Sequence, residues 1–429
     1  MQVAGPEFVS TVRWPDGSDA AFAVPVPTLI SRPPSDKEIR MPSHSPFPRR
    51  RSVRVSLLAA LVATVVTGSL VLVGQSGDPT TPTAASAPAA SLAPAAPHAG
   101  AWQATPVPVK KGDLTAVAAL SDKQAWAVGY RLKSATSLEA VALRWDGKTW
   151  TQESTLPDNS FPQALAVRSA TDIWAVGSAS AHWDGTKWTA YQLDKDPSGH
   201  VVPDAVATTS DGKVWTAGRA MGRSIKDGVP AVQSWDGKAW HRQSLPDVGK
   251  GELSGITAVA PDDIWAVGAA YAPDEKSQQS ALLLHFDGSN WRRVAAPGPQ
   301  TTHNWLGGIT ALSADDIWAV GGSTTGSTER PLAVHWNGST WTTARTPDVA
   351  DGRLRGVGKT GNGDLWALGG KGAAPVALHW NDQHDQWEKT TAPDLVIRSF
   401  TTVPHSADLW ATGISPHGDL IPAITRLKN

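Results

Sequence analysis

One five-residue pattern constrains the fold more than any other feature of the chain. It consists of an apolar residue, Trp, a small residue, another apolar residue and Gly, as in IWAVG at 173–177. Seven copies follow residue 110, and their Trp residues are Trp126, Trp174, Trp215, Trp265, Trp318, Trp366 and Trp410. Consecutive copies lie 41 to 53 residues apart. A period of about 40–50 residues is typical of β-propeller blades, each built from four strands. The pattern therefore predicts seven blades.

Each repeat also carries signals for its other strands. An apolar residue precedes the motif Trp by nine residues in six repeats, and in the seventh Phe400 precedes it by ten. These residues lie in short alternating runs that predict an inner strand. Downstream, an aromatic-Asp/Asn-Gly-x-x-Trp segment predicts a tight hairpin between strands three and four, because Gly adopts positive φ at no steric cost. The segments are RWDGKTW (144–150), HWDGTKW (182–188), SWDGKAW (234–240), HFDGSNW (285–291) and HWNGSTW (335–341).

The two ends of the repeat region complement each other. The last repeat stops at Asn429, where its third strand should turn, so it lacks a fourth strand. Ahead of the first repeat, WQATPVP at 102–108 reads as an orphan fourth strand. We therefore predict an all-β, seven-bladed propeller at 101–429, with four-stranded antiparallel blades and an N-terminal strand that closes the last blade. Closure of this kind leaves no free strand edge between blades.

A hydrophobic segment precedes the repeats. An uncharged run at 55–77 follows four Arg residues between 49 and 54. It predicts one N-terminal hydrophobic helix whose basic side stays in the cytoplasm. Two alternatives stay open: an uncleaved signal anchor, favoured by the length of the run, and a cleaved signal peptide, for which Ala85-Ser86-Ala87 supplies a small-x-small site. In either case the repeats are expected outside the cytoplasm, on a single-pass membrane anchor (N-in, C-out) or secreted.

The segments on either side of this run differ in character. Residues 78–100 are rich in Pro and Ala, which predicts a semi-rigid linker that cannot bury a core. Residues 1–54 show no sustained periodicity up to residue 40. They are either a disordered cytoplasmic tail or a mis-assigned start, with Met41 as the true first residue.

Composition excludes several classes of function. The chain has no Cys, so disulfides, thiolate metal sites and a lipidated cysteine are excluded. Its 38 basic and 39 acidic residues nearly balance, and the basic excess lies before residue 55. The propeller is thus mildly acidic, which argues against a nucleic-acid partner.

The repeat resembles that of a group of secreted bacterial propellers with D-[IV]-W-A-V-G and H-W-[DN]-G-x-x-W segments, over residues 101–429. It is more distantly similar to the Asp-box repeats of sialidase-type propellers, although the leading Ser of that motif is absent. Its likeness to galactose-oxidase or kelch propellers is looser still, and the copper site of that oxidase needs a Tyr–Cys cross-link that a chain without Cys cannot form. The resemblance implies the propeller fold, and most members of the first group have no assigned activity.

The residues that suggest chemistry are better explained by the fold. The motif Trp residues are expected to pack blade on blade rather than to stack on sugars. His182, His285, His335 and His379 occupy one repeat position in four blades, so they do not converge on a metal. The pairs Asp262-Asp263 and Asp315-Asp316 fall in hairpin turns, and GVGKTG at 356–361 lacks the spacing of a phosphate loop. We predict no catalytic residues, no metal site and no cofactor.

Connections between strands two and three, and between blades, share one face of the ring and differ in every repeat. Variable loops on a rigid scaffold commonly carry function. Candidate ligand-binding residues on this face are Tyr130, Arg131, His200, Arg219, Arg223, Tyr271, His303, Trp305, Glu329 and Arg330.

These features favour a non-catalytic, extracytoplasmic binding module whose partner is a glycan, a cell-wall polymer or a protein. An uncleaved 55–77 segment adds the membrane as a partner. One alternative is an enzyme of the glycosidase or lyase type, which needs convergent carboxylates with a Tyr, or an arginine cluster, on the variable face. Another is a sensor or structural domain of a single-pass membrane protein.

Overall fold

The computed structural model describes residues 10–13, 19–22 and 100–429, apart from 135–136, 158–159, 195–199, 222–226, 273–278 and 300–302. The elements within these ranges are β-strands. The hydrophobic segment expected at 55–77 and the linker at 78–100 lie outside them, except for Gly100. No helix in the described ranges is long and apolar enough to span a bilayer. In the N-terminal segment, β1 (Ser10–Arg13) pairs with β2 (Asp19–Phe22), a hairpin that the sequence patterns did not predict.

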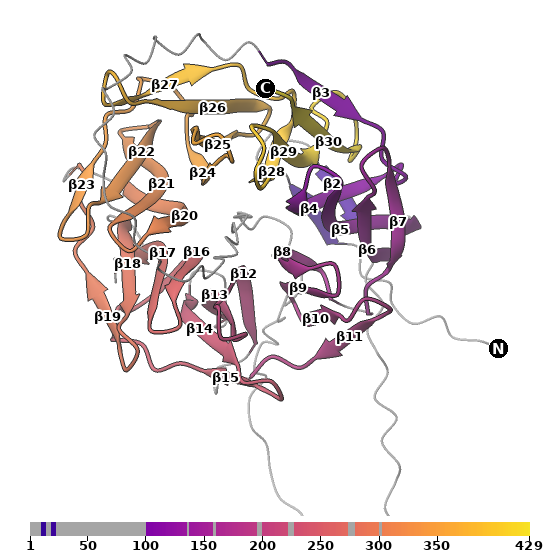
Figure 1. The fold of residues 1–429 in the computed structure, drawn as a ribbon, viewed down its shortest axis with the longest axis horizontal. Coiled ribbons are helices and arrows are strands. Elements are labelled where there is room, and N and C mark those ends of the chain that lie inside the picture. The colour runs from indigo at the N-terminus through magenta and orange to yellow at the C-terminus, as the bar shows by residue number, and fades with distance from the viewer. Residues whose placement is uncertain are drawn as a thin grey trace, which may run out of the picture.

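Residues 100–429 form a seven-bladed ring of four-stranded antiparallel sheets in the described part of the chain (Figure 1). Blade one contains β4 (Gly112–Ser121), β5 (Gln124–Ser134), β6 (Ser137–Trp145) and β7 (Trp150–Thr155). Blade two contains β8 (Pro162–Ser169), β9 (Asp172–Gly177), β10 (Ser180–Trp183) and β11 (Trp188–Tyr191). Blade three contains β12 (Val201–Thr208), β13 (Val214–Ala220), β14 (Val229–Trp235) and β15 (Trp240–Arg242).

The remaining blades repeat this order. Blade four contains β16 (Gly251–Ala260), β17 (Asp263–Tyr271), β18 (Gln279–Phe286) and β19 (Trp291–Val294). Blade five contains β20 (His303–Ser313), β21 (Asp316–Thr325), β22 (Thr328–Trp336) and β23 (Trp341–Thr343). Blade six contains β24 (Leu354–Lys359), β25 (Leu365–Lys371), β26 (Ala374–Asn381) and β27 (Gln386–Thr390). The first strand of each blade lies nearest the centre of the ring (Figure 1).

The seventh blade confirms the predicted closure. It contains β28 (Val396–Thr402), β29 (Leu409–Ile414) and β30 (Pro422–Leu427), and its fourth strand is β3 (Trp102–Thr105). Trp102 is paired with Leu427, and Thr105 with Ile424. The two ends of the domain therefore complete one sheet, which removes the open edge.

The motif Trp residues pack between blades, as predicted. Trp318 of blade five lies against Trp380 and Trp387 of blade six, with ring centroids 4.8 and 5.6 Å apart. The same arrangement recurs around the ring, and Trp410 of blade seven contacts Trp145 of blade one at 5.0 Å. Trp366 of blade six is the exception among these contacts: it packs in a cluster with Leu427 and Trp102 at the closure. Buried aromatic pairs of this kind stabilise each interface beyond the area that they bury.

The predicted turns are also present. In the segment at 182–188, Asp184 Oδ1 accepts hydrogen bonds from the backbone N–H groups of Thr186 (2.8 Å) and Lys187 (2.9 Å). Gly185 adopts a φ of 97°, a conformation that disfavours side chains. Asn337 makes the equivalent bonds in blade five, to Ser339 (3.1 Å) and Thr340 (2.9 Å). These Asx turns lie on the face of the ring opposite the blade-to-blade connections, and we call that face the turn face.

Candidate functional site: the mouth of the central channel

Antiparallel pairing decides which side chains share a face. The starts of strands one and three and the ends of strands two and four all lie on the side where one blade connects to the next. We call this side the connection face. Two of the connections between strands two and three are largely strand: β5 ends at Ser134 and β6 begins at Ser137, while β21 ends at Thr325 and β22 begins at Thr328. In blades one and five, strands two and three stay hydrogen-bonded to each other beyond the motif Gly. These blades therefore differ from the others mainly in the length of the hairpin between strands two and three.

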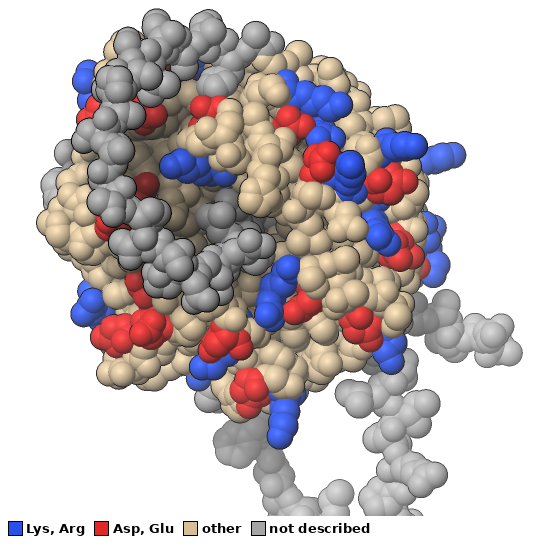
Figure 2. Space-filling model, viewed as in Figure 1, with Lys and Arg blue, Asp and Glu red and all other residues tan. Residues whose placement is uncertain are grey.

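Every inner strand carries a β-bulge at the same place near the connection face. The register between strands one and two skips one residue in each blade. The skipped residues are Thr115, Gln163, Asp204, Ser254, Gly307, Arg355 and Arg398. Bulges redirect side chains and are frequent beside functional sites. We call this set the bulge ring, and six of its seven members are polar. Figure 2 shows a hollow at the centre of the ring, with basic and acidic side chains on its wall.

Blades six and seven place three guanidinium groups near the bulge ring, beside a carboxylate of blade one. Arg398 donates from Nε to Oδ2 of the buried Asp113 at 2.8 Å. Arg353 donates to both carboxylate oxygens of Glu329, at 2.7 and 2.6 Å. In the described part of the chain, Arg355 has no carboxylate within salt-bridge distance, and its buried Nε and Nη1 have no hydrogen-bond partner. Burial, together with Arg398 and Arg353, lowers the pKa of Arg355 to about 9, so it stays charged at neutral pH. We call Arg353, Arg355 and Arg398 the arginine cluster.

Blades three and four place carboxylates at the same face. Arg219 of β13 forms an ion pair with Glu252 of β16, and both lie close to the buried Asp204. Burial raises the pKa of Asp204 to about 8, with Arg219 opposing and Glu252 reinforcing the shift. Burial and a hydrogen bond to Glu252 raise the pKa of Tyr271 as well. We call Asp204, Arg219, Glu252 and Tyr271 the acidic cluster. Two carboxylates and a phenol thus lie close together at this face.

Half of the predicted binding residues lie in or beside these clusters. Arg219 and Tyr271 belong to the acidic cluster, and Glu329 binds Arg353 of the arginine cluster. Trp305 lies under the guanidinium of Arg353, 5.7 Å from its carbon to the ring centroid. Tyr130 pairs with Asp113 across β4 and β5, and burial raises its pKa, with Asp113 adding to the shift.

The other predicted residues lie apart from the clusters. Arg131 binds Glu139, with Nε 2.6 Å from Oε2, in the β5–β6 hairpin. Arg330 forms an ion pair with Asp348. His303 accepts a hydrogen bond from the backbone of Gln279 at 3.1 Å, and His200 is exposed before β12. Arg223 lies outside the described residues.

The residues that sequence reasoning missed are on the inner strands. Asp113, Asp204, Glu252, Arg355 and Arg398 lie within segments that are otherwise apolar and buried. The prediction placed the binding residues in variable loops and therefore did not include these strand residues. A signal was nevertheless available, because a charged residue lies 11 to 13 positions before the motif Trp in five of the seven repeats, all but the second and the fifth. A charge in a buried strand needs a partner or a ligand.

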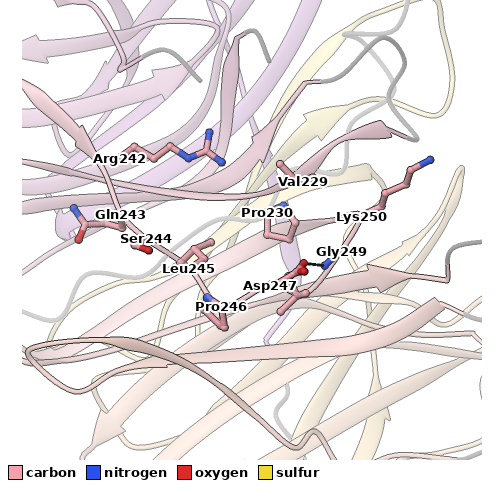
Figure 3. A pocket seen from close by; sticks show the side chains of 11 residues that line it. Val229, Pro230, Arg242, Gln243, Ser244, Leu245, Pro246, Asp247, Gly249 and Lys250 are labelled. Carbon is pink, nitrogen blue, oxygen red and sulfur yellow. Dashed lines mark hydrogen bonds between the residues drawn. The ribbon is translucent and has the colours of Figure 1, made fainter. Parts of the chain in front are cut away.

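Two surface clefts also open on the connection face. One of about 440 Å³ lies between Val229 of β14 and the connection that runs from Arg242 to Lys250 (Figure 3). Within it the backbone N–H of Gly249 donates to Asp247 at 3.0 Å. A cleft of about 230 Å³ occupies the equivalent place in blade four. Each is lined by a Pro six residues after the Trp that opens the fourth strand, Pro246 after Trp240 and Pro297 after Trp291. The clefts therefore follow from the repeat and do not single out one blade. Nor do the described residues hold a group of three side chains suited to a metal ion.

Comparison with known proteins identifies the class of fold. A solved streptogramin B lyase aligns with a TM-score of 0.54 and 12% identity, over 77% of this chain and 98% of that one. The WD40 propeller domain of Doa1 aligns with a TM-score of 0.53 and 12% identity, over 76% and 97%. YCF48 bound to a D1 peptide reaches a TM-score of 0.49 with 14% identity, over 76% and 95%. No protein-family model and no curated protein matches the chain.

At such low identity, the first two likenesses establish the fold alone. The chain is a seven-bladed β-propeller, and its function has to be argued from the site.

Proposed function

We propose that the propeller is a binding module whose ligand contacts the channel mouth on the connection face. The bulge ring carries this proposal, because the same backbone irregularity places a polar side chain in six of seven blades, and these six residues are of five types. A rigid scaffold with varied groups around one opening is suited to selective recognition.

The chemistry of the mouth favours a polar ligand. Among the described residues from 100 to 429, Ile421 is the only large hydrophobic side chain that is exposed, at 44%. An apolar protein interface needs a contiguous patch, and one side chain does not supply it. Charged groups, by contrast, gather in the arginine cluster and the acidic cluster. A glycan or a cell-wall polymer with polar groups therefore fits the mouth better than an apolar partner does.

The binding test uses the full-length protein in detergent, retained on isolated cell-wall material and on a glycan array. We expect saturable retention that falls by about tenfold or more in Trp305→Ala and in Arg355→Gln. The matched controls Lys148→Ala and Lys238→Ala lie in hairpins of the turn face and should leave retention unchanged. Equal losses in both sets would contradict a site at the channel mouth. Absence of any retention would exclude these polymers and direct the search to protein partners.

We also propose that the domain works outside the cytoplasm. The basic residues before the uncharged run at 55–77 support this orientation. Protease added to intact cells should then degrade the propeller while a cytoplasmic marker survives. Recovery of the propeller in the cell medium would indicate cleavage, and full protection in intact cells would contradict the proposal.

The acidic cluster favours a second candidate function, an enzyme of the glycosidase or lyase type. Asp204 has a raised pKa of about 8, and Tyr271 and Glu252 share a hydrogen bond beside it. A protonated carboxyl beside a carboxylate is the arrangement used for acid and base catalysis of glycoside cleavage. Turnover of a retained polysaccharide that is abolished in Asp204→Asn would establish the enzyme. Retention without any product would leave the binding module as the function.

A further inference from the structure

Arg355 has an unusual place among the charged residues of the mouth. It is the bulge residue of β24, and it lies between the bulge position of blade five, Gly307, and that of blade seven, Arg398. A Cβ added at Gly307 would lie 2.7 Å from the carbonyl oxygen of Leu354, so no side chain fits at that position. The wall beside Arg355 therefore lacks a side chain of blade five at the level of the bulge.

The charges around Arg355 do not balance. Asp113 and Glu329 are each engaged by another guanidinium, Arg398 and Arg353. Lys371 Nζ lies 3.6 Å from Glu329 and 3.4 Å from Asp351, so Lys371 and Asp351 add one charge of each sign. One positive charge thus remains on Arg355. Two buried nitrogens of its guanidinium have no hydrogen-bond partner in the described part of the chain. Buried donors without hydrogen-bond partners cost free energy in a protein interior.

We propose that Arg355 binds the carboxylate of an acidic sugar at the channel mouth, which deepens the proposed function and depends on it. A guanidinium fork binds a planar carboxylate through two parallel hydrogen bonds. One carboxylate also balances one surplus charge. A sugar hydroxyl beside the carboxylate can add a hydrogen bond to the polar side chains of the mouth, which acetate cannot do.

The test compares four probes on the full-length protein by saturation-transfer NMR: glucuronate, glucose, glucose 6-phosphate and acetate. Glucuronate carries both the carboxylate and the hydroxyl donors, and each other probe lacks or replaces one of these. We expect saturable binding of glucuronate, weaker binding of acetate, and no binding of glucose. Binding of glucose 6-phosphate equal to or tighter than that of glucuronate would overturn the carboxylate assignment.

Variants place the site. Arg355→Gln should weaken glucuronate binding by about tenfold or more, and Arg355→Lys should bind with intermediate affinity because it keeps the charge without the fork. The control Arg292→Gln changes an exposed Arg of β19 and should bind glucuronate as the unaltered protein does. Unchanged binding in a folded Arg355→Gln overturns the inference. If that variant does not fold, the probe series on the unaltered protein decides, and glucuronate binding no tighter than glucose binding overturns it.

The outcome separates this inference from the proposed function. Retention on cell-wall material that persists in Arg355→Gln, together with failure of glucuronate to bind, overturns the acidic-sugar subsite alone. Loss of retention in the Trp305→Ala variant would in that case still support the channel mouth as the binding surface.

Discussion

His285 lies flat on Trp265, with ring centroids 4.0 Å apart and an interplanar angle of 21°. Its Nε2 lies 2.7 Å from Oδ1 of Asp263, which belongs to the first hairpin turn of the same blade. His335 repeats the arrangement on Trp318 at 4.2 Å. In blade seven the guanidinium of Arg426 takes the same place over Trp410, at 5.0 Å. The position therefore covers one face of the motif Trp and ties it to the turn, which explains the repeated His without a metal.

The first prediction concerns this stacking. His285→Ala should lower the free energy of unfolding by about 1–3 kcal/mol, because it removes an aromatic contact and a partly buried hydrogen bond. Blade three already has Ser234 at the equivalent position, so the fold should survive the change. Urea denaturation followed by Trp fluorescence measures the effect. Zn²⁺ should shift the unfolding midpoint of neither protein, and a Zn²⁺ stabilisation lost in His285→Ala would contradict the structural role.

The second prediction concerns the closure. Trp102 donates from Nε1 to the carbonyl oxygen of Thr391 at 2.9 Å and packs in the cluster that contains Trp366. Trp102→Ala should cost about 2–4 kcal/mol, because the seventh blade loses the aromatic contact supplied by its fourth strand. The neighbouring Gln103 is exposed, and Gln103→Ala should cost less than about 0.5 kcal/mol. Equal effects in urea denaturation would mean that β3 stabilises the ring through its backbone alone.

Repetition made the fold readable from sequence. With seven copies of one pattern, the strand assignment of a single repeat can be checked against the other six. The match between 102–108 and the unfinished last repeat predicted how the ring closes. The site lacked this advantage, because binding residues are those that differ between repeats. Asp204 and Arg355 lie 11 residues before their motif Trp, at a position where the residue type varies between repeats. Val206 and Val357, two residues later, match the apolar residue of the other repeats. No residue type marks the bulges that redirect these side chains, since Thr, Gln, Ser and Gly occupy the same position in other blades. The bulges could therefore not be predicted from the sequence.

The third prediction concerns acid stability. Hydrogen bonds from Thr186 and Lys187 lower the pKa of Asp184 to about 2. Its folded pKa lies below the unfolded value of about 3.8, so its contribution to stability is complete above that value and is lost as the pH falls through about 2. The stability difference between the unaltered protein and Asp184→Asn should therefore shrink between about pH 4 and pH 2. The reciprocal change, Asn337→Asp, should add acid sensitivity, and parallel pH profiles for all three proteins would contradict the account.

The fourth prediction concerns Asp204. Burial raises its folded pKa to about 8, so the folded protein holds a proton that the unfolded chain releases near pH 4. Stability contributed by this proton is complete below about pH 4 and declines as the pH rises to about 8. Asp204→Asn should remove this decline and raise the urea midpoint at pH 8 relative to pH 5. Arg219, Glu252 and Tyr271 face the same group, so Tyr271→Phe serves as the control that should keep the pH dependence.

The fifth prediction contrasts two members of the arginine cluster. Arg355 brings a surplus positive charge beside Arg398 and Arg353, and its pKa is lowered by burial first and by these two neighbours second. Arg355→Gln should therefore raise the free energy of unfolding by about 1 kcal/mol, since removing a strained functional group commonly stabilises a protein. Arg398→Gln should lower it by about 3 kcal/mol or more, because Asp113 would be left as a buried carboxylate without its ion-pair partner. The two variants carry the same substitution at bulge positions of adjacent blades, so generic effects of losing an Arg cancel in the comparison. Urea denaturation at pH 7 measures the free energy of unfolding of both variants. Destabilisation of equal size would mean that the interactions of Arg355 are as favourable as those of Arg398. That result would remove the physical reason for a ligand to bind Arg355.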